Sequence, residues 1–192
     1  FRMGVAPNAE VRLQIDESAT RTSTNNYIGI STLAIGTKIK ITDSKGSIPK
    51  ISFLGTLLIP GSSHSNYLPQ HIGIQTHLLF ESELNEYFSL GYDIGTEWDG
   101  ETNNPNIFFG ACLNYQATNK LSFFIESYNL YNSQKQEDWA KPGRSSHFNF
   151  MSEIGAAYMV TPRFQVNMYG DINFNEPSKY ANIGLGMAWL IK

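Results

Sequence analysis

Large apolar residues stand at every second position in the last twelve residues of the chain, Ala181–Lys192. They are Ile183, Leu185, Met187, Trp189 and Ile191, and the positions between them are small or polar except for Leu190. Because side chains alternate across a β-strand, this spacing predicts a strand with one apolar face and one face of small or polar side chains. The apolar face is too bulky, and the opposite face too slight, for a soluble barrel with its apolar face inside. The pattern favours a transmembrane strand with lipid on its outside and a lumen on its inside.

The composition predicts one domain, residues 1–192, with little charge. Charged residues make up 16% of the chain and the net charge is -3, so no basic surface is available for nucleic acid. No run approaches the roughly 18 apolar residues of a membrane helix. The mean hydropathy of -0.27 would by itself suggest a soluble protein, but transmembrane barrels escape this measure because only alternate residues in their strands are apolar. Cys112 is the single cysteine, which excludes an internal disulfide, and we expect it to be a packed, inward-facing thiol.

Segments with alternating apolar and polar residues recur along the whole chain, and helical periodicity is nearly absent. Turn residues separate these segments. The sequence therefore predicts an all-β protein with strands at 1–5, 10–17, 28–42, 50–60, 71–83, 87–98, 106–117, 120–132, 146–160, 163–174 and 181–192.

The connections between these strands alternate in length. Those at 6–9, 43–49, 84–86, 118–119 and 161–162 are short, whereas those at 17–27, 61–70, 99–105, 133–145 and 175–180 are mostly longer and more polar. Short turns at one rim and long loops at the other are typical of antiparallel, up-and-down barrels of the bacterial outer membrane. We expect the short turns to face the periplasm and the long loops to face the exterior.

The order of the connections also predicts the number of strands. The last strand follows a long loop, so it runs toward the periplasm and places Lys192 at that rim. Counting backward, strand 1–5 runs the same way, although bacterial barrels hold an even number of strands with both ends in the periplasm. The eleven strands of this chain therefore predict a further strand upstream of Phe1, which makes about twelve and pairs with Ala181–Lys192.

Charged residues keep to one side of the predicted strands. Val11, Leu13 and Ile15, for example, alternate with charged and polar neighbours, and the same holds in most other strands. A charge at a lipid-facing midplane position costs about 2–4 kcal/mol, which explains this segregation. Strands 50–60 and 120–132 are ambiguous, because large apolar residues occupy both of their faces.

The inward charges are the only group of residues with a functional pattern. The candidates for lining a lumen are His77, Asp93, Glu126, Glu153 and Asp171 near mid-height, and Arg12, Lys38 and Lys40 nearer the periplasmic mouth. Carboxylates around a pore favour cations or polar donors. The alternative is a lumen filled by ion pairs, since buried charges need partners.

The sequence offers little for catalysis or for a metal. His64 lies between two serines in a predicted loop, and His147 and Ser152 are spaced so that they fall on opposite faces of one strand. The loop Trp98–Asn106 contains oxygen ligands but no calcium-loop spacing, and it reads equally well as a solvated loop. We therefore expect no enzymatic activity, no catalytic residue, no metal site and no cofactor.

Several segments together resemble one known family. They are FRMGVAPNAEVRLQI (1–15), LAIGTKIKI (33–41), ISFLGTLLIPGSS (51–63), LSFFIESYNLY (121–131), IGAAYMVTPRFQVNMYGDINFN (154–175) and ANIGLGMAWLIK (181–192). They are similar to the opening hairpin, inner strands and final hairpins of the outer-membrane β-barrel family named as transporters of the phenol meta-degradation pathway. The resemblance implies a twelve-stranded barrel that passes small, hydrophobic or aromatic molecules. It supplies no site residue, and the chain departs from the common barrel ending, an aromatic residue, by closing on Lys192.

Three functions remain open from the sequence. The first is a porin-like passive channel or transporter for small molecules in the outer membrane of a Gram-negative bacterium. The second is a structural or accessory barrel with a filled lumen, in contact with other outer-membrane proteins. The third is a soluble ligand-binding barrel such as a lipocalin, which the outward apolar residues oppose. In the first two, outer-membrane lipid is the expected partner.

Overall fold

The computed structural model describes residues 1–21, 26–60, 71–98, 104–132, 148–174 and 180–189. These residues form one antiparallel sheet in which every strand pairs with its neighbours in sequence, in the order β1 to β11. The strands are β1 (Arg2–Ala6), β2 (Ala9–Arg21), β3 (Asn26–Thr42), β4 (Lys50–Leu58), β5 (Gly73–Glu83), β6 (Phe88–Trp98), β7 (Asn106–Gln116), β8 (Leu121–Asn132), β9 (Phe148–Thr161), β10 (Phe164–Asn173) and β11 (Tyr180–Trp189). The predicted all-β, up-and-down order of eleven strands is confirmed.

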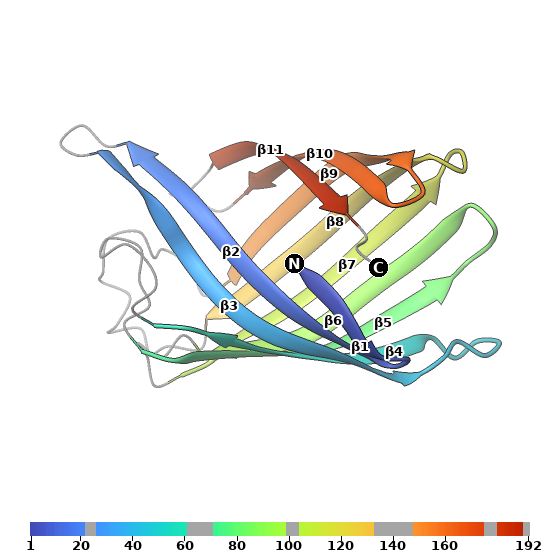
Figure 1. Cartoon of the computed structure of the whole chain (residues 1–192), viewed down its shortest axis with the longest axis horizontal. Coiled ribbons are helices and arrows are strands. Elements are labelled where there is room, and N and C mark those ends of the chain that lie inside the picture. Colours follow the sequence, from blue (N-terminus) through green and yellow to red (C-terminus); the bar gives the residue numbers. More distant parts are fainter. Residues whose placement is uncertain (22–25, 61–70, 99–103, 133–147, 175–179, 190–192) are drawn as a thin grey trace.

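The sheet curls around a hollow but is not closed (Figure 1). No pairing joins β1 to β11 within the described residues, so a closed barrel, which the sequence predicts only with a further strand, is not confirmed. Because eleven strands alternate in direction, β1 and β11 run the same way. The first and last strands therefore run in the same direction, as the sequence predicts; that this direction is toward the periplasm stays a prediction.

One predicted loop is largely strand. The polar segment 17–27 was expected to connect two strands, but β2 continues to Arg21 and β3 begins at Asn26. The pairing runs from Ala9↔Ile39 to Arg21↔Asn26, with one irregularity between Asp16 and Glu17. This ladder consists of backbone hydrogen bonds, which form whether or not the side chains alternate in polarity. The expectation of a long loop here was wrong for that reason.

The short turns are closed by local hydrogen bonds from polar residues. Asn85 Oδ1 accepts hydrogen bonds from the backbone N–H groups of Tyr87 (2.9 Å) and Phe88 (3.0 Å) between β5 and β6. Thr118 Oγ1 accepts one from the N–H of Leu121 (3.0 Å) between β7 and β8. Asn and Thr side chains that bond the backbone two or three residues on are common in tight turns. They set the position at which each strand reverses.

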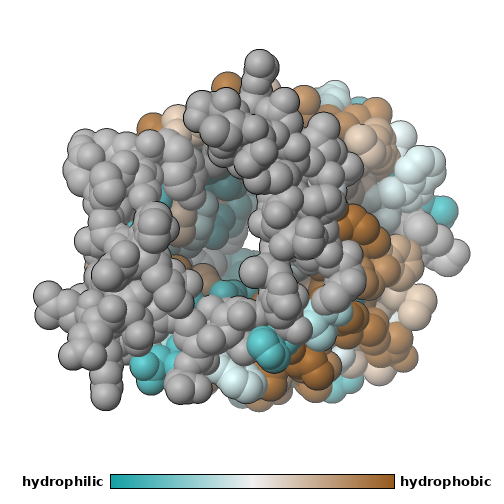
Figure 2. Space-filling view, turned by 90° about the vertical axis from the view of Figure 1, so that its left-hand side faces the viewer, coloured by the Kyte–Doolittle hydropathy of each residue, from teal (hydrophilic) through white to brown (hydrophobic). Residues whose placement is uncertain are grey.

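The two faces of the sheet differ sharply in polarity. On β6 the apolar side chains of Phe88, Tyr92, Ile94 and Trp98 are 36–53% exposed, whereas Gly95 on the other face is buried. Ala34 is the one buried apolar residue among the described positions. The apolar side chains thus lie on the outside of the curl and the polar ones line its hollow. In Figure 2, hydrophilic atoms are visible inside the hollow, and hydrophobic atoms cover much of the outer surface at the lower right.

We call the apolar side of the sheet the outer face, and the polar side, which lines the hollow, the inner face. Strand β4, which was ambiguous in sequence, follows the same rule: Phe53 and Leu57 are exposed on the outer face (37% and 46%). Leu54 and Leu58 are half-buried on the inner face. The inner face therefore contains some apolar side chains among its polar ones.

Candidate functional site

The predicted lumen residues lie on strands β2, β3, β5, β6, β8, β9 and β10. Six of them line cavities on the inner face: Lys38, Lys40, His77, Asp93, Glu126 and Glu153. The strand register places Arg12 and Asp171 on the same face, because Arg12 stands opposite Gly36 and Asp171 stands opposite Glu153. Neither of the two lines any of these three cavities. That these eight side chains line a passage stays a prediction.

Three cavities follow one another along the inner face. The first cavity, of about 310 Å³, lies between Lys38 and Lys50 at one end and Asp93 and Glu126 at the other. The second, of about 270 Å³, shares Asp93 and Glu126 with the first. The third, of about 240 Å³, shares Lys38 and Lys50 with the first. The first cavity therefore connects an acidic region to a basic one.

Three carboxylates stand directly opposite one another on adjacent strands of the acidic region. Glu126 of β8 pairs with Glu153 of β9, and Glu153 pairs with Asp171 of β10. We call these three residues the acidic row. Residues directly opposite in a sheet have Cβ atoms about 4.5–5.5 Å apart, and like charges at that distance destabilise the pairing. In the described part of the chain, neither Glu126 nor Glu153 has an ion pair or hydrogen bond to offset this repulsion.

A histidine–aspartate pair lies beside the acidic row. His77 Nδ1 and Asp93 Oδ2 are 2.7 Å apart, and both side chains are partly buried. The pair has space because its cross-strand neighbours are glycines. A Cβ on Gly95 would lie 2.5 Å from His77 Nδ1, and a Cβ on Gly110 would lie 2.6 Å from Asp93 Oδ1. The glycines at these two positions thus allow the pair to form.

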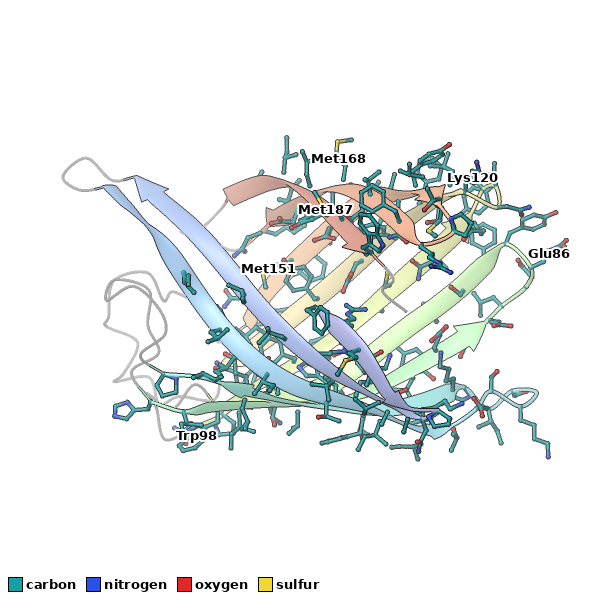
Figure 3. All side chains as sticks on the ribbon, viewed as in Figure 1. Glu86, Trp98, Lys120, Met151, Met168 and Met187 are labelled. Carbon is teal, nitrogen blue, oxygen red and sulfur yellow. The ribbon has the colours of Figure 1, made fainter. Side chains whose placement is uncertain are left out.

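Figure 3 shows the side chains that crowd both faces of the sheet. Three aromatic residues, Phe108, Phe109 and Tyr128, join the pair around the second cavity. The ring of Phe108 lies 5.6 Å from the ring of His77, and Tyr128 lines the same cavity. The second cavity therefore combines aromatic rings with the carboxylates of Asp93, Glu126 and Glu153.

Most charges in the basic region are paired locally. The distances between nitrogen and oxygen are 2.5 Å for Arg12–Glu10, 2.8 Å for Lys40–Asp43 and 2.9 Å for Lys50–Glu81. Each pair joins residues of one strand, of a strand and its turn, or of two adjacent strands. Sequence reasoning did not include Lys50 and Glu81 among the lumen candidates; for Lys50 the reason is that strand 50–60 gave no clear facing. The pairing of Lys50 with Glu81 in the β4–β5 register would have identified them.

Comparison with known protein families identifies one match. The model of the family described as "Putative MetA-pathway of phenol degradation" matches residues 1–191. The chain belongs to this family. The resemblance found in its sequence motifs is thereby confirmed. A search of the curated proteins found no match.

This member of the phenol-degradation family shows no group of three or more metal-ligating side chains among its described residues. His64, His147 and most of the loop Trp98–Asn106 lie outside the described residues. Cys112 faces the first cavity, as its parity predicts, but it is half-buried and not fully packed, with its Sγ atom 3.8 Å from Asn114 Oδ1. In the described segments no helix is both long and apolar enough to cross a membrane.

Proposed function

We propose that the chain is a passive channel for small molecules, formed by a closed β-barrel in the outer membrane of a Gram-negative bacterium. The observation that carries this proposal is the inverted polarity of the sheet. Apolar side chains cover the outer face, and charged side chains surround connected cavities on the inner face. A sheet of this kind is stable with lipid around it and water within it.

Aromatic contacts near both ends of the strands support a membrane location. At the rim of the short turns, Phe88 lies 4.9 Å from Tyr115 and Phe164 lies 5.6 Å from Trp189, measured between ring centroids. Toward the other rim, the outer face carries the pairs Phe109–Phe148 and Phe150–Phe174. Two bands of aromatic rings at headgroup level are typical of membrane barrels.

The free edges of the sheet support closure by one further strand. Since β1 and β11 run in the same direction, direct pairing between them would be parallel. A strand between them, running the opposite way, would pair antiparallel with both and give an even total of about twelve. The outer side chains of β11 are the most exposed of the sheet, with Ile183 at 84% and Leu185 at 80%, as expected for a strand that still lacks a neighbour.

The inner face supports passage of molecules with a polar group and an apolar body. All the ion pairs described for this face run along its wall and none spans the hollow, so they do not close it. In the second cavity, Phe108 and Tyr128 can contact an aromatic ring while a neighbouring carboxylate accepts a hydrogen bond from its hydroxyl group. We propose no chemical step on the passing molecule.

A second candidate is an accessory barrel with a filled lumen, working beside other outer-membrane proteins. The ion pairs of Arg12, Lys40, Lys50 and His77 favour it, because they satisfy inner charges without any solute. Conductance decides between the candidates. The first predicts steps of ionic current when the purified protein is added to a planar lipid bilayer. If no current steps occur and small sugars do not leak from proteoliposomes, the accessory barrel with a filled lumen is the candidate that remains.

The same bilayers test which residues face the path. Glu126→Gln and Asp93→Asn remove negative charge from the first two cavities, so we expect the reversal potential in a salt gradient to shift toward anions. Glu83→Gln is the matched control, since Glu83 is exposed at the end of β5 and lines none of the three cavities. An unchanged reversal potential in both inner variants would remove Glu126 and Asp93 from the proposed path.

A further inference from the structure

Among the described residues, the first cavity has an unpaired cation at one end and an unpaired anion at the other. Lys38 comes from β3 and Glu126 from β8, and four strands of the sheet lie between them. Neither side chain makes an ion pair or hydrogen bond with any other described residue. Partly buried charges are costly unless a partner meets them, so the two ends of this cavity are suited to a ligand that carries both charges.

The described residues around Lys38 provide no ion-pair partner for its ammonium group. Lys38 stands opposite Glu10 in the β2–β3 register, but Glu10 binds Arg12 at 2.5 Å. On its other side, Lys38 faces the apolar Leu54. Lys50, which also borders the cavity, is held by Glu81 at 2.9 Å. One positive charge without a bonded partner therefore remains on this side.

The described residues around Glu126 likewise provide no positively charged partner for its carboxylate. Its cross-strand neighbours are Cys112 on β7 and Glu153 on β9, and neither supplies a positive charge. Asp93, the other carboxylate of the first cavity, is bonded to His77. A bound ammonium group would give Glu126 an opposite charge and would reduce its repulsion with Glu153.

The residues that line the cavity between the two charges include small ones and apolar ones. Ser52 is buried at 3% exposure, and it stands opposite Leu79, which in turn stands opposite Asp93. Gly91 faces the same cavity. These side chains leave room for a short apolar body between a carboxylate at Lys38 and an ammonium group at Glu126.

We infer that the first cavity binds small zwitterions, with the ligand's carboxylate at Lys38 and its ammonium group at Glu126. Ligand sites in proteins usually span about 300–1,000 Å³, so a cavity of about 310 Å³ is suited to a molecule of a few heavy atoms. The inference deepens the proposed channel, on which it rests, by naming a class of solute.

Three probes of matched length test the inference on the whole protein in detergent micelles. They are 5-aminopentanoate, which carries both charges, pentanoate, which carries only the negative one, and pentylammonium, which carries only the positive one. Because each charge-assisted contact strengthens binding, we expect the zwitterion to bind about tenfold more tightly than either singly charged probe in calorimetric titration. Equal affinity for the three probes, or no binding of the zwitterion, would overturn the inference.

Variants at the two ends assign the contacts. Lys38→Met should lower the affinity for 5-aminopentanoate to that of pentylammonium, and Glu126→Gln should lower it to that of pentanoate. Lys40→Met is the matched control for the first, because Lys40 lies two residues along the same strand, binds Asp43 and does not line the first cavity. Glu97→Gln is the control for the second, since Glu97 is hydrogen-bonded to Gln75 outside that cavity. Losses as large in the controls as in the cavity variants would contradict the assignment.

Leak measurements separate this inference from the proposed function. Proteoliposomes that pass arabinose and salt, combined with equal binding of the three probes, would refute the zwitterion site and leave the channel standing. Proteoliposomes that pass neither would refute the channel, whereas selective binding in micelles would then still support a zwitterion site within a closed lumen.

Discussion

The outer and inner faces of β6 come from the same eleven residues, yet they require different surroundings. Ile94 on the outer face is 53% exposed and has only apolar or aromatic neighbours across the strands, Leu78 and Phe109. Asp93, the preceding residue, is bonded to His77 on the inner face. A soluble sheet buries its apolar side and exposes its polar side. The reversed arrangement here is the one that the proposed membrane channel requires, because an apolar medium would then cover the outer face.

A charge placed on the outer face should have the largest effect on stability, because it removes the difference in polarity between the two faces. Ile125→Arg puts a guanidinium on β8 at a position that is 55% exposed between Leu113 and Ile154. Because lipid cannot solvate the charge, we expect the free energy of unfolding from vesicles to fall by about 2–4 kcal/mol. Denaturant titration of the protein in vesicles measures it.

Asn114→Lys is the control for this charge on the inner face. Asn114 borders the first cavity, where water or a carboxylate can meet the added ammonium group. The control should therefore cost much less than Ile125→Arg. Equal losses for the two variants would show that the faces do not differ in their surroundings.

A methyl group added on the inner face should have a smaller effect. In Gly95→Ala the new Cβ would lie 2.5 Å from the backbone oxygen of Thr76 and 2.5 Å from His77 Nδ1. Since the backbone cannot move aside easily, we expect a loss of about 1–3 kcal/mol in the same titration. Gly110→Ala sharpens the comparison, because its Cβ meets mainly the Asp93 carboxylate, which can rotate away. A loss for Gly110→Ala that equals or exceeds that for Gly95→Ala would contradict this account of the glycines.

Removing one charge from the acidic row should have the smallest effect, and a stabilising one. Glu153 lies between Glu126 and Asp171, so Glu153→Gln removes two like-charge contacts at once. Cross-strand pairs of this kind contribute about 0.2–1 kcal/mol, and we expect a gain of that size. Glu81→Gln should instead lower stability slightly, because Glu81 is bonded to Lys50. A loss on removing Glu153 would mean that the row is held by a bound cation or proton.

The strands could be predicted from the sequence because alternation in polarity is a direct consequence of β geometry. Ile183, Leu185, Met187 and Trp189 stand on one parity, and the structure places this segment in β11. The ends of β2 and β3 could not be predicted, since backbone pairing continues there without alternation. Closure of the sheet is a property of pairing between strand edges, which no single segment encodes.

The inner residues could be predicted as a set but not as partners. Parity placed His77 and Asp93 on one face, whereas their pairing depends on the β5–β6 register and on the small size of Gly95 and Gly110. The isolation of Lys38 follows from the preference of Glu10 for Arg12, a choice between two neighbours that spacing does not reveal. The face on which each side chain lies could therefore be predicted from the sequence, whereas the contacts between side chains depend on the register of the strands.

Spin-label accessibility along β7 tests the central claim that the outer face meets lipid and the inner face meets water. With Cys112→Ser as the background, single labels at successive positions from Ile107 to Tyr115 are exposed in vesicles to oxygen, which partitions into lipid, and to a water-soluble nickel chelate. We predict collisions with oxygen at Ile107, Phe109, Leu113 and Tyr115, and collisions with nickel at Phe108, Gly110 and Asn114. Two profiles that rise and fall together, with nickel reaching both faces equally, would contradict the account.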